Sequence, residues 1–335
     1  MKTTVLLVNL GTPDSASTSD VRKYLTEFLN DERVIDIHPI ARFLLVNGII
    51  VPFRAPKSAK LYKHIFNERG SPLLFHGLDL QQKLQQRLGD DYIVEFGMRY
   101  QNPNVTEALA RIQTNGTHNL IIVPLYPQYA SSSTGSTLQK IYSVIGKWQT
   151  MPSIKVIHQF YKDEGFINSV VENGNKFNLK DYQHVVFSFH GLPERQIKKG
   201  DCHNHCLQNN CCEIITEKNF SCYRAGSFDT AKMIASKMNI TKENYTVSFQ
   251  SRLGKTPWIK PYTDEVLIGL AEKGVKKILC FSPAFVADCL ETLHEIGTEY
   301  QELFVEHGGE KIQLVPSLNS NDTWMEALKN IVLGA

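Results

Sequence analysis

The sequence predicts an α/β fold with two similar Rossmann-like lobes, each a parallel sheet flanked by helices. Three observations carry this prediction. The chain has 335 residues, enough for two domains with cores of their own. Apolar, β-rich runs alternate with helical patterns along its length, which is typical of parallel sheets covered by helices on both faces. The two halves also repeat one another in sequence.

Short apolar segments mark the expected strands. They are residues 5–10, 92–96, 120–125, 154–160, 185–189, 245–249, 278–281 and 312–315. Ligands of open parallel sheets bind outside the carboxyl ends of the strands, so the residues that follow these segments are the first candidates for function.

An internal repeat relates the two halves. Val-Asn-Leu-Gly-Thr-Pro at residues 8–13 matches Ser-Phe-His-Gly-Leu-Pro at residues 188–193, and both Gly11/Gly191 and Pro13/Pro193 are offset by 180 residues. We therefore expect an N-terminal lobe over residues 1–165 and a C-terminal lobe over residues 166–335, with the active cleft between them.

Composition and missing motifs exclude several functions. The formal charge of +2 gives no electrostatic argument for nucleic acid. No G-x-G-x-x-G follows an expected strand, so we expect neither nicotinamide nor flavin. Residues 1–4 lead directly into an apolar strand without a leader pattern, which favours a cytoplasmic protein. An apolar segment over residues 43–54 is too short to span a bilayer. A buried core helix is favoured there, and an exposed lip touching a membrane or an apolar ligand is the alternative.

His190 is the first candidate for chemistry. It ends the expected strand at residues 185–189, and an imidazole at the carboxyl end of a strand is available for proton or metal chemistry near neutral pH. A histidine satisfied by hydrogen bonds at a turn is the alternative. In the repeat, Leu10 holds the equivalent position, so we expect the chemistry in the second lobe.

An acidic stripe follows another strand end in the second lobe. Asp288, Glu291 and Glu295 are spaced three and four residues apart, which places them on one face of a helix. Asp288 with Glu291 also resembles a capping box, and for Asp288 alone the cap is favoured. Together with His190, these carboxylates could bind a divalent cation and accept protons.

Aromatic and arginine side chains of the first half could hold a large, flat substrate. Tyr62 and Tyr126 offer ring faces, although each alone is more typical of core packing. Arg54 and Arg99 could bind carboxylate groups of a ligand bidentately.

Five cysteines crowd one segment of the second half, an expected insertion over residues 200–224. In a cytoplasmic chain such density points to a metal centre rather than to disulfides, and both zinc and an iron–sulfur cluster take thiolate ligands. The candidates are Cys202, Cys206, Cys211, Cys212 and Cys222.

Ordered motifs along nearly the whole chain resemble those of the ferrochelatases, the terminal enzymes of haem synthesis. The motifs are the segments at residues 6–13, 97–100, 126–135, 188–193, 249–258 and 288–293.

This resemblance implies a chelatase-like fold and the insertion of ferrous iron, the metal substrate, into protoporphyrin or a related porphyrin. It implies metal-site roles for His190 and Glu291, and an acidic path at Asp288 and Glu295. It also implies a porphyrin cleft lined by Leu10, Arg54, Tyr62, Arg99 and Tyr126. Cys289 departs from the family, since some relatives have a histidine beside this glutamate.

The resemblance also favours a two-iron two-sulfur cluster in the cysteine segment, since some bacterial members carry one there. A further cysteine expected soon after Cys222 is replaced by Gly226 and Ser227. Either Cys202 substitutes for it, or the cluster is lost. Zinc remains the alternative metal for these cysteines.

Two other functions stay open on the sequence alone. One is a chelatase that inserts cobalt or nickel into a related tetrapyrrole, and the other is a non-catalytic haem- or metal-binding protein. The expected partners are porphyrin and iron, with no nucleic acid. The chain is expected to be a monomer or homodimer in the cytoplasm, and peripheral contact with the inner face of the membrane is the alternative that the apolar segment leaves open.

Overall fold

A computed structural model describes residues 2–254 and 256–335, and in it the chain forms two compact units. The first unit contains Met1–Tyr126, Ser131–Gln159 and Ser320–Ala335. The second contains Pro127–Ala130 and Phe160–Asn319. The chain therefore passes between the units more than once, and its last residues belong to the first unit.

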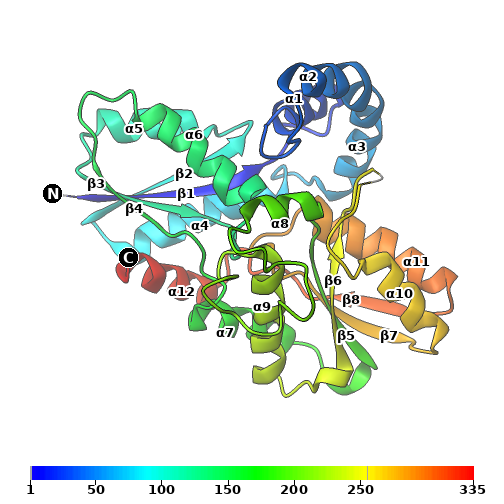
Figure 1. Ribbon diagram of the computed structural model, residues 1–335. Helices are drawn as coiled ribbons and strands as arrows, with labels where there is room; N and C mark the ends of the chain where they lie inside the picture. The colour runs from blue at the N-terminus through cyan, green and yellow to red at the C-terminus, as the bar shows by residue number, and fades with distance from the viewer. Residues whose placement is uncertain (1, 255) are drawn as a thin grey trace. The chain divides into compact units, whose positions relative to one another are not determined.

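The first unit is built on a four-stranded sheet in which all described pairings are parallel. The strand order is β2-β1-β3-β4. Apolar residues of β1, α5, β3 and α6 form a core on one face of this sheet, and α4 covers the other face (Figure 1). The strands are β1 (Thr3–Gly11), β2 (Tyr92–Tyr100), β3 (Asn119–Pro124) and β4 (Ser153–Val156).

The helices of the first unit begin at recognisable signals. Ser17 and Asn104 cap α1 and α5 through their side chains, and Pro72 opens α4 at a position where a missing N–H costs nothing. The described helices are α1 (Thr18–Leu29), α2 (Pro39–Leu45), η1 (Val46–Ile50), α3 (Val51–Ile65), α4 (Pro72–Leu88), α5 (Val105–Thr114), η2 (Ser131–Gly135), α6 (Ser136–Ile145) and α12 (Asp322–Leu333).

The second unit repeats this plan with the parallel order β6-β5-β7-β8. Helices α10 and α11 pack on one face of the sheet, and α7 and α9 lie on the other (Figure 1). The strands are β5 (His184–His190), β6 (Tyr245–Gln250), β7 (Lys277–Phe281) and β8 (Lys311–Leu314). The helices are α7 (Glu164–Gly174), η3 (Leu179–Asp181), α8 (Glu194–Gly200), α9 (Tyr223–Lys237), η4 (Lys242–Asn244), α10 (Thr263–Glu272), η5 (Glu291–Tyr300) and α11 (Gln301–Glu306).

The predicted fold class is confirmed. Each predicted strand is present, and the two sheets have the same order, as the sequence repeat requires. The segment at residues 154–160 was predicted too long, because the strand ends at Val156. Beyond it, the N–H groups of Phe160 and Tyr161 donate to the carbonyl of Pro127, which takes the chain away from the sheet.

The apolar segment at residues 43–54 is an exposed lip, so the expectation of a buried core helix was wrong. Phe43 is 61% exposed and Phe53 is 72% exposed, whereas Val46 and Val51 turn inward. The segment covers the end of α2, the π-helical η1 and the start of α3, and only one side of these turns packs on the unit. Among the residues described here, no helix is both long and apolar enough to cross a bilayer.

Candidate functional site

His190 ends β5, and its ring is fixed in one tautomer. Its Nδ1 lies 2.6 Å from the carbonyl oxygen of Gly191. A carbonyl oxygen can only accept, so Nδ1 carries the proton and Nε2 keeps its lone pair. The ring is half-buried beside that of Phe285, with the centroids 6.4 Å apart. The imidazole is therefore a base whose accepting nitrogen is set by the local backbone.

Gln250, at the end of β6, links the end of β5, where His190 lies, to η5, the helix that carries Glu291 and Glu295. It pairs with His190 across the sheet, and its carbonyl accepts from the N–H of Gly191 at 2.8 Å. Its Nε2 donates to the carbonyl of Glu291 at 3.0 Å and to Glu295 Oε2 at 3.1 Å. The parallel register thus brings the imidazole and the two glutamates to one sheet edge, as the sequence suggested.

Glu295 is held by a group of hydrogen-bond donors. Its carboxylate accepts from the Ser251 N–H at 2.8 Å, from Ser251 Oγ at 2.5 Å and from the Tyr300 hydroxyl at 3.0 Å. Burial raises the pKa of Glu295, and the negative Glu291 adds to that rise; Ser251, His190 and Tyr300 act in the opposite direction. A carboxyl with a raised pKa is protonated over a wider pH range than an ordinary glutamate, which suits a group that transfers protons.

Glu291 begins η5 and is half-buried. The neighbouring thiol of Cys289 is buried and hydrogen-bonded to the Glu291 side chain; burial together with that carboxylate raises the pKa of Cys289 well above its usual value. Cys289 therefore stays protonated and donates. The segment is π-helical rather than the α-helix that the spacing predicted, and π-turns are frequent at functional sites.

Asp288 is buried and turned toward the loop after β8. Its carboxylate accepts from the Ser317 N–H at 3.1 Å, from Asn319 Nδ2 at 2.8 Å and from Thr292 Oγ1 at 3.3 Å. The side chain that serves the start of the helix is that of Thr292, which accepts from the Cys289 N–H at 3.0 Å. Asp288 therefore does not form the capping box with Glu291 that the sequence favoured. Its carboxylate instead joins the start of η5 to the loop after β8.

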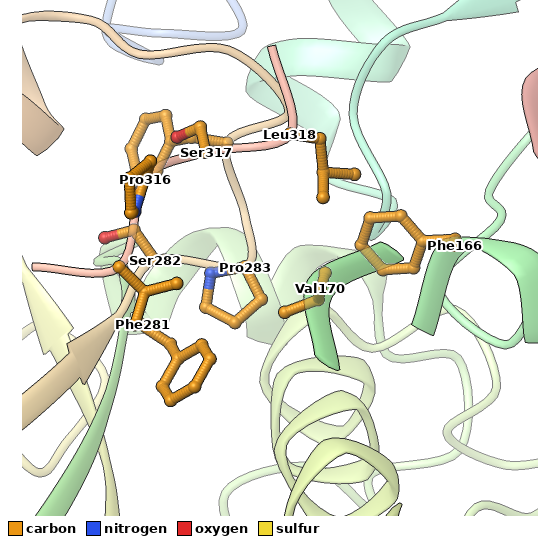
Figure 2. Close-up of a pocket in the computed structure, with 10 residues that line it drawn as sticks. Phe166, Val170, Phe281, Ser282, Pro283, Pro316, Ser317 and Leu318 are labelled. Atoms are coloured by element: carbon orange, nitrogen blue, oxygen red, sulfur yellow. The ribbon is translucent and has the colours of Figure 1, made fainter. Parts of the chain in front are cut away.

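A small pocket lies beside this loop, and Figure 2 shows its lining. Its volume is about 20 Å³, room for about one water molecule and far less than a porphyrin needs. The hydroxyls of Ser282 and Ser317 are buried there without a hydrogen-bond partner, so a single water fits its chemistry. The pocket is a packing feature of the second unit rather than a substrate site.

Arg99, in the first unit, is already paired. Its Nη2 lies 2.5 Å from Asp31 Oδ2, its Nε donates to Ser136 Oγ at 2.8 Å, and its guanidinium covers the ring of Tyr100 at 4.4 Å. Burial alone would raise the pKa of Asp31, but hydrogen bonds from Ser136 and the Arg33 N–H, with the Arg99 charge, lower it below its usual value. Arg99 is thus fixed in a buried network rather than extended toward solvent.

The other candidate substrate-binding residues of the first unit differ in how far they are exposed to solvent. Leu10 is the last residue but one of β1 and is half-buried, and Arg54 lies exposed on α3. Tyr62 is buried and its ring packs edge-on against Tyr24. Tyr126 is half-buried with its hydroxyl 3.4 Å from Thr137 Oγ1, and burial raises its pKa. Of these residues, Arg54 is the charged group most accessible to a ligand.

Four of the five clustered cysteines lie close together. Cys211 Sγ lies 3.6 Å from Cys212 Sγ, and the thiol of Cys222 interacts electrostatically with those of both Cys206 and Cys212. Cys206, Cys211 and Cys212 are buried, whereas Cys202 is exposed. Burial raises the pKa values of Cys206 and Cys211, so these thiols are protonated at neutral pH.

The spacing of these sulfurs bears on metal binding. Within the described residues, no group of three or more His, Cys, Asp or Glu side chains is arranged around a single metal position. Two thiolates on one tetrahedral metal, with bonds of about 2.3 Å, lie about 3.8 Å apart, close to the Cys211–Cys212 distance of 3.6 Å. Cys211 and Cys212 therefore have the spacing of two thiolates bound to one metal.

The sequence alone did not reveal some residues of the site. Gln250 and Ser251 lie in the motif at residues 249–258 but carry no chemistry that singles them out. Tyr300 follows Glu295 by five residues, and only the π-helical turn brings its hydroxyl to the carboxylate. Tyr223 opens α9, and its buried phenol interacts with the backbone of His190.

Two parallel α/β units, one with an imidazole and two carboxylates at its strand ends, define a chelatase-like α/β protein. SirB from Bacillus subtilis with Fe3+ matches the fold at a TM-score of 0.53 and 13% identity, over 99% of this chain and 95% of that one. The ferrochelatase family model matches residues 2–335. Ferrochelatase of Legionella pneumophila (strain Lens) is 46% identical over 332 residues, 99% of each chain. That of Coxiella burnetii (strain CbuK_Q154) is 43% identical over 97% of this chain and 91% of its own. The chain belongs to the ferrochelatase family, the porphyrin metal chelatases.

Proposed function

We propose that this protein inserts ferrous iron into protoporphyrin IX or a related porphyrin to make haem, with His190 as the base and Glu291, Glu295 and Asp288 as an acidic relay. The observation that supports these residue roles lies at the carboxyl ends of the strands in the second unit. There, an imidazole with a free Nε2 and a carboxyl of raised pKa belong to one hydrogen-bonded network.

Metallation requires two protons to leave the ring. A free-base porphyrin and Fe²⁺ give haem and two protons, so the site needs groups that accept them in turn. His190 Nε2 takes a pyrrole proton as general base, because its Nδ1 is already committed to Gly191. Glu291 binds the metal or accepts the second proton. Glu295, whose pKa is raised, receives that proton and passes it on.

Bending the macrocycle lowers the barrier, because the nitrogen lone pairs then point out of the ring plane toward the metal. An enzyme can hold that shape with binding energy from remote contacts. Leu10, Tyr62 and Tyr126 would supply apolar and aromatic surface for the ring. Arg54, which is exposed, would bind a carboxylate tail, and Arg99 would act through its network with Asp31.

A two-iron two-sulfur cluster is the proposed occupant of the cysteine segment, held by Cys206, Cys211, Cys212 and Cys222. The proximity of these thiols to one another and the exposure of Cys202 support this set. When bound, such a cluster supplies a one-electron couple. The protein holds the sulfurs close together and largely away from water.

Peripheral contact with the membrane is proposed for the apolar lip at residues 43–54. Its exposed Phe43 and Phe53 are flanked by Arg42, Arg54 and Lys57, and an apolar face rimmed by cations suits an anionic lipid surface.

The test of the main proposal is the loss of free-base porphyrin fluorescence on incubation with protoporphyrin and Fe²⁺ without oxygen. We expect His190→Ala and Glu291→Gln each to lower kcat at least 100-fold while the far-UV circular dichroism is unchanged. His184→Ala, at the other end of β5, and Glu302→Gln, exposed on α11, are the matched controls. Near-normal rates in both site variants would overturn the assignment of residues.

The same assay separates the alternative functions. Faster insertion of cobalt or nickel than of iron would favour the related chelatase. Porphyrin binding without any loss of free-base fluorescence would favour a non-catalytic binding protein.

A further inference from the structure

Arg224 reaches the cysteine segment from the first turn of α9. Its Nη1 lies 3.0 Å from the sulfur of Cys212, and its Nε donates to the carbonyl of Lys260 at 3.1 Å. The guanidinium carbon lies 4.6 Å from the ring centroid of Phe228, one turn along the same helix. Two partners besides the sulfur therefore fix the orientation of this cation.

The surroundings of the four thiols otherwise favour neutral sulfur. Cys206, Cys211 and Cys212 are buried, and the carboxylate of Asp201 accepts the N–H of Cys206 at 2.7 Å, which adds negative charge close to the segment. A cluster held by four thiolates carries net negative charge. Its burial costs free energy unless a cation compensates for it, and an arginine cannot lose its charge at neutral pH.

We propose that Arg224 is a positioning residue of the cysteine centre, which donates a charged hydrogen bond to Cys212 and stabilises the reduced form of the bound cluster. The inference rests on the proposed cluster and adds to it the residue that compensates its charge. Reduction adds one negative charge, so a fixed cation stabilises the reduced form more than the oxidised one. Arg224 therefore raises the reduction potential, as hydrogen bonds and charges near cluster sulfurs do.

The experiment uses the full-length protein purified and reconstituted without oxygen. The cluster is followed by visible absorption and by electron paramagnetic resonance after reduction, and its potential by redox titration. We expect Arg224→Gln to shift the midpoint potential to more negative values and to lose its cluster to a chelator at least 10-fold faster. Arg224→Lys keeps the charge without the rigid fork, so we expect a smaller shift in the same direction.

Arg69→Gln is the matched control, because Arg69 also stacks on an aromatic ring, that of Phe75, at 4.5 Å but lies in the first unit. It should leave the potential unchanged. If Arg224→Gln retains no cluster, the potential of Arg224→Lys decides in its place.

The outcomes separate the two proposals. A colourless wild-type protein that takes up no iron and sulfide on reconstitution overturns the cluster, and the inference with it. A wild-type cluster whose potential and chelator resistance are the same in the Arg224 variants overturns the inference alone.

Discussion

Replacing Asp31 by Asn removes the acceptor at the centre of a buried network in the first unit. Asp31 Oδ2 accepts from Arg99 Nη2 at 2.5 Å, from Ser136 Oγ at 2.5 Å and from the Tyr100 hydroxyl at 2.9 Å. The side chains of Arg99 and Asp31 are only 14% and 5% exposed. The amide oxygen of asparagine can keep the bond from the Arg33 N–H. The amide NH2 group then faces the three other donors and can accept a hydrogen bond from none of them.

Breaking a buried ion pair on one side costs about 3–5 kcal/mol, because the remaining charge stays buried without its partner. For a unit of this size, each kcal/mol lowers the melting temperature by about 2–4 °C, so we expect a fall of about 10 °C. Differential scanning calorimetry of wild type and Asp31→Asn measures it. The porphyrin KM should change with it, because Arg99 loses its fixed orientation.

The pH dependence gives an independent check with a definite sign. The pKa of Asp31 is lowered in the folded protein, so its contribution to stability is fully present above the unfolded pKa. That contribution is lost as the pH falls through the lowered folded pKa. The stability difference between wild type and Asp31→Asn should therefore shrink at acidic pH. A difference below about 1 kcal/mol at pH 7, or one that grows on acidification, would refute this account of the network.

Two further predictions concern the acidic relay and the lip. Tyr300→Phe removes a hydrogen bond that lowers the pKa of Glu295, so the acidic limb of the metallation pH profile should move to higher pH. Tyr142→Phe, at an exposed tyrosine, is the control that should leave the limb in place. An unmoved limb would separate Glu295 from proton transfer. The pair Phe43→Asp and Phe53→Asp should lower binding to phosphatidylserine vesicles at least 10-fold with little change in melting temperature, because both rings are exposed. Equal vesicle binding by wild type and the pair would remove the lip as a membrane contact.

The sheets were predictable because strands in parallel sheets are short and apolar and alternate with helices, and because the repeat carries the strand order of one half into the other. The position of His190 followed from the same logic, since the end of a strand can be read from where its apolar run stops. The lip was not predictable from hydropathy. An apolar run has the same composition whether or not a neighbour covers it, and Phe43 and Phe53 have no such neighbour within their unit.

Pairing between distant residues was the other limit. Asp31 and Arg99 are 68 residues apart, and no sequence pattern links them, so the pairing of Arg99 with a buried carboxylate could not be predicted. The cysteine segment shows the same difficulty, because spacing alone left five thiols equivalent. Only the fold separates exposed Cys202 from the four that lie close together.

The last helix has a consequence for how the chain folds as it is synthesised. Although α12 follows the whole second unit in sequence, it packs on α4 in the first unit, where Arg87 and Lys83 bind Asp322 and the carbonyl of Ser320. The N-terminal unit is therefore the last to be completed on the ribosome. Until α12 emerges, the face of α4 that it covers stays open to solvent and to chaperones.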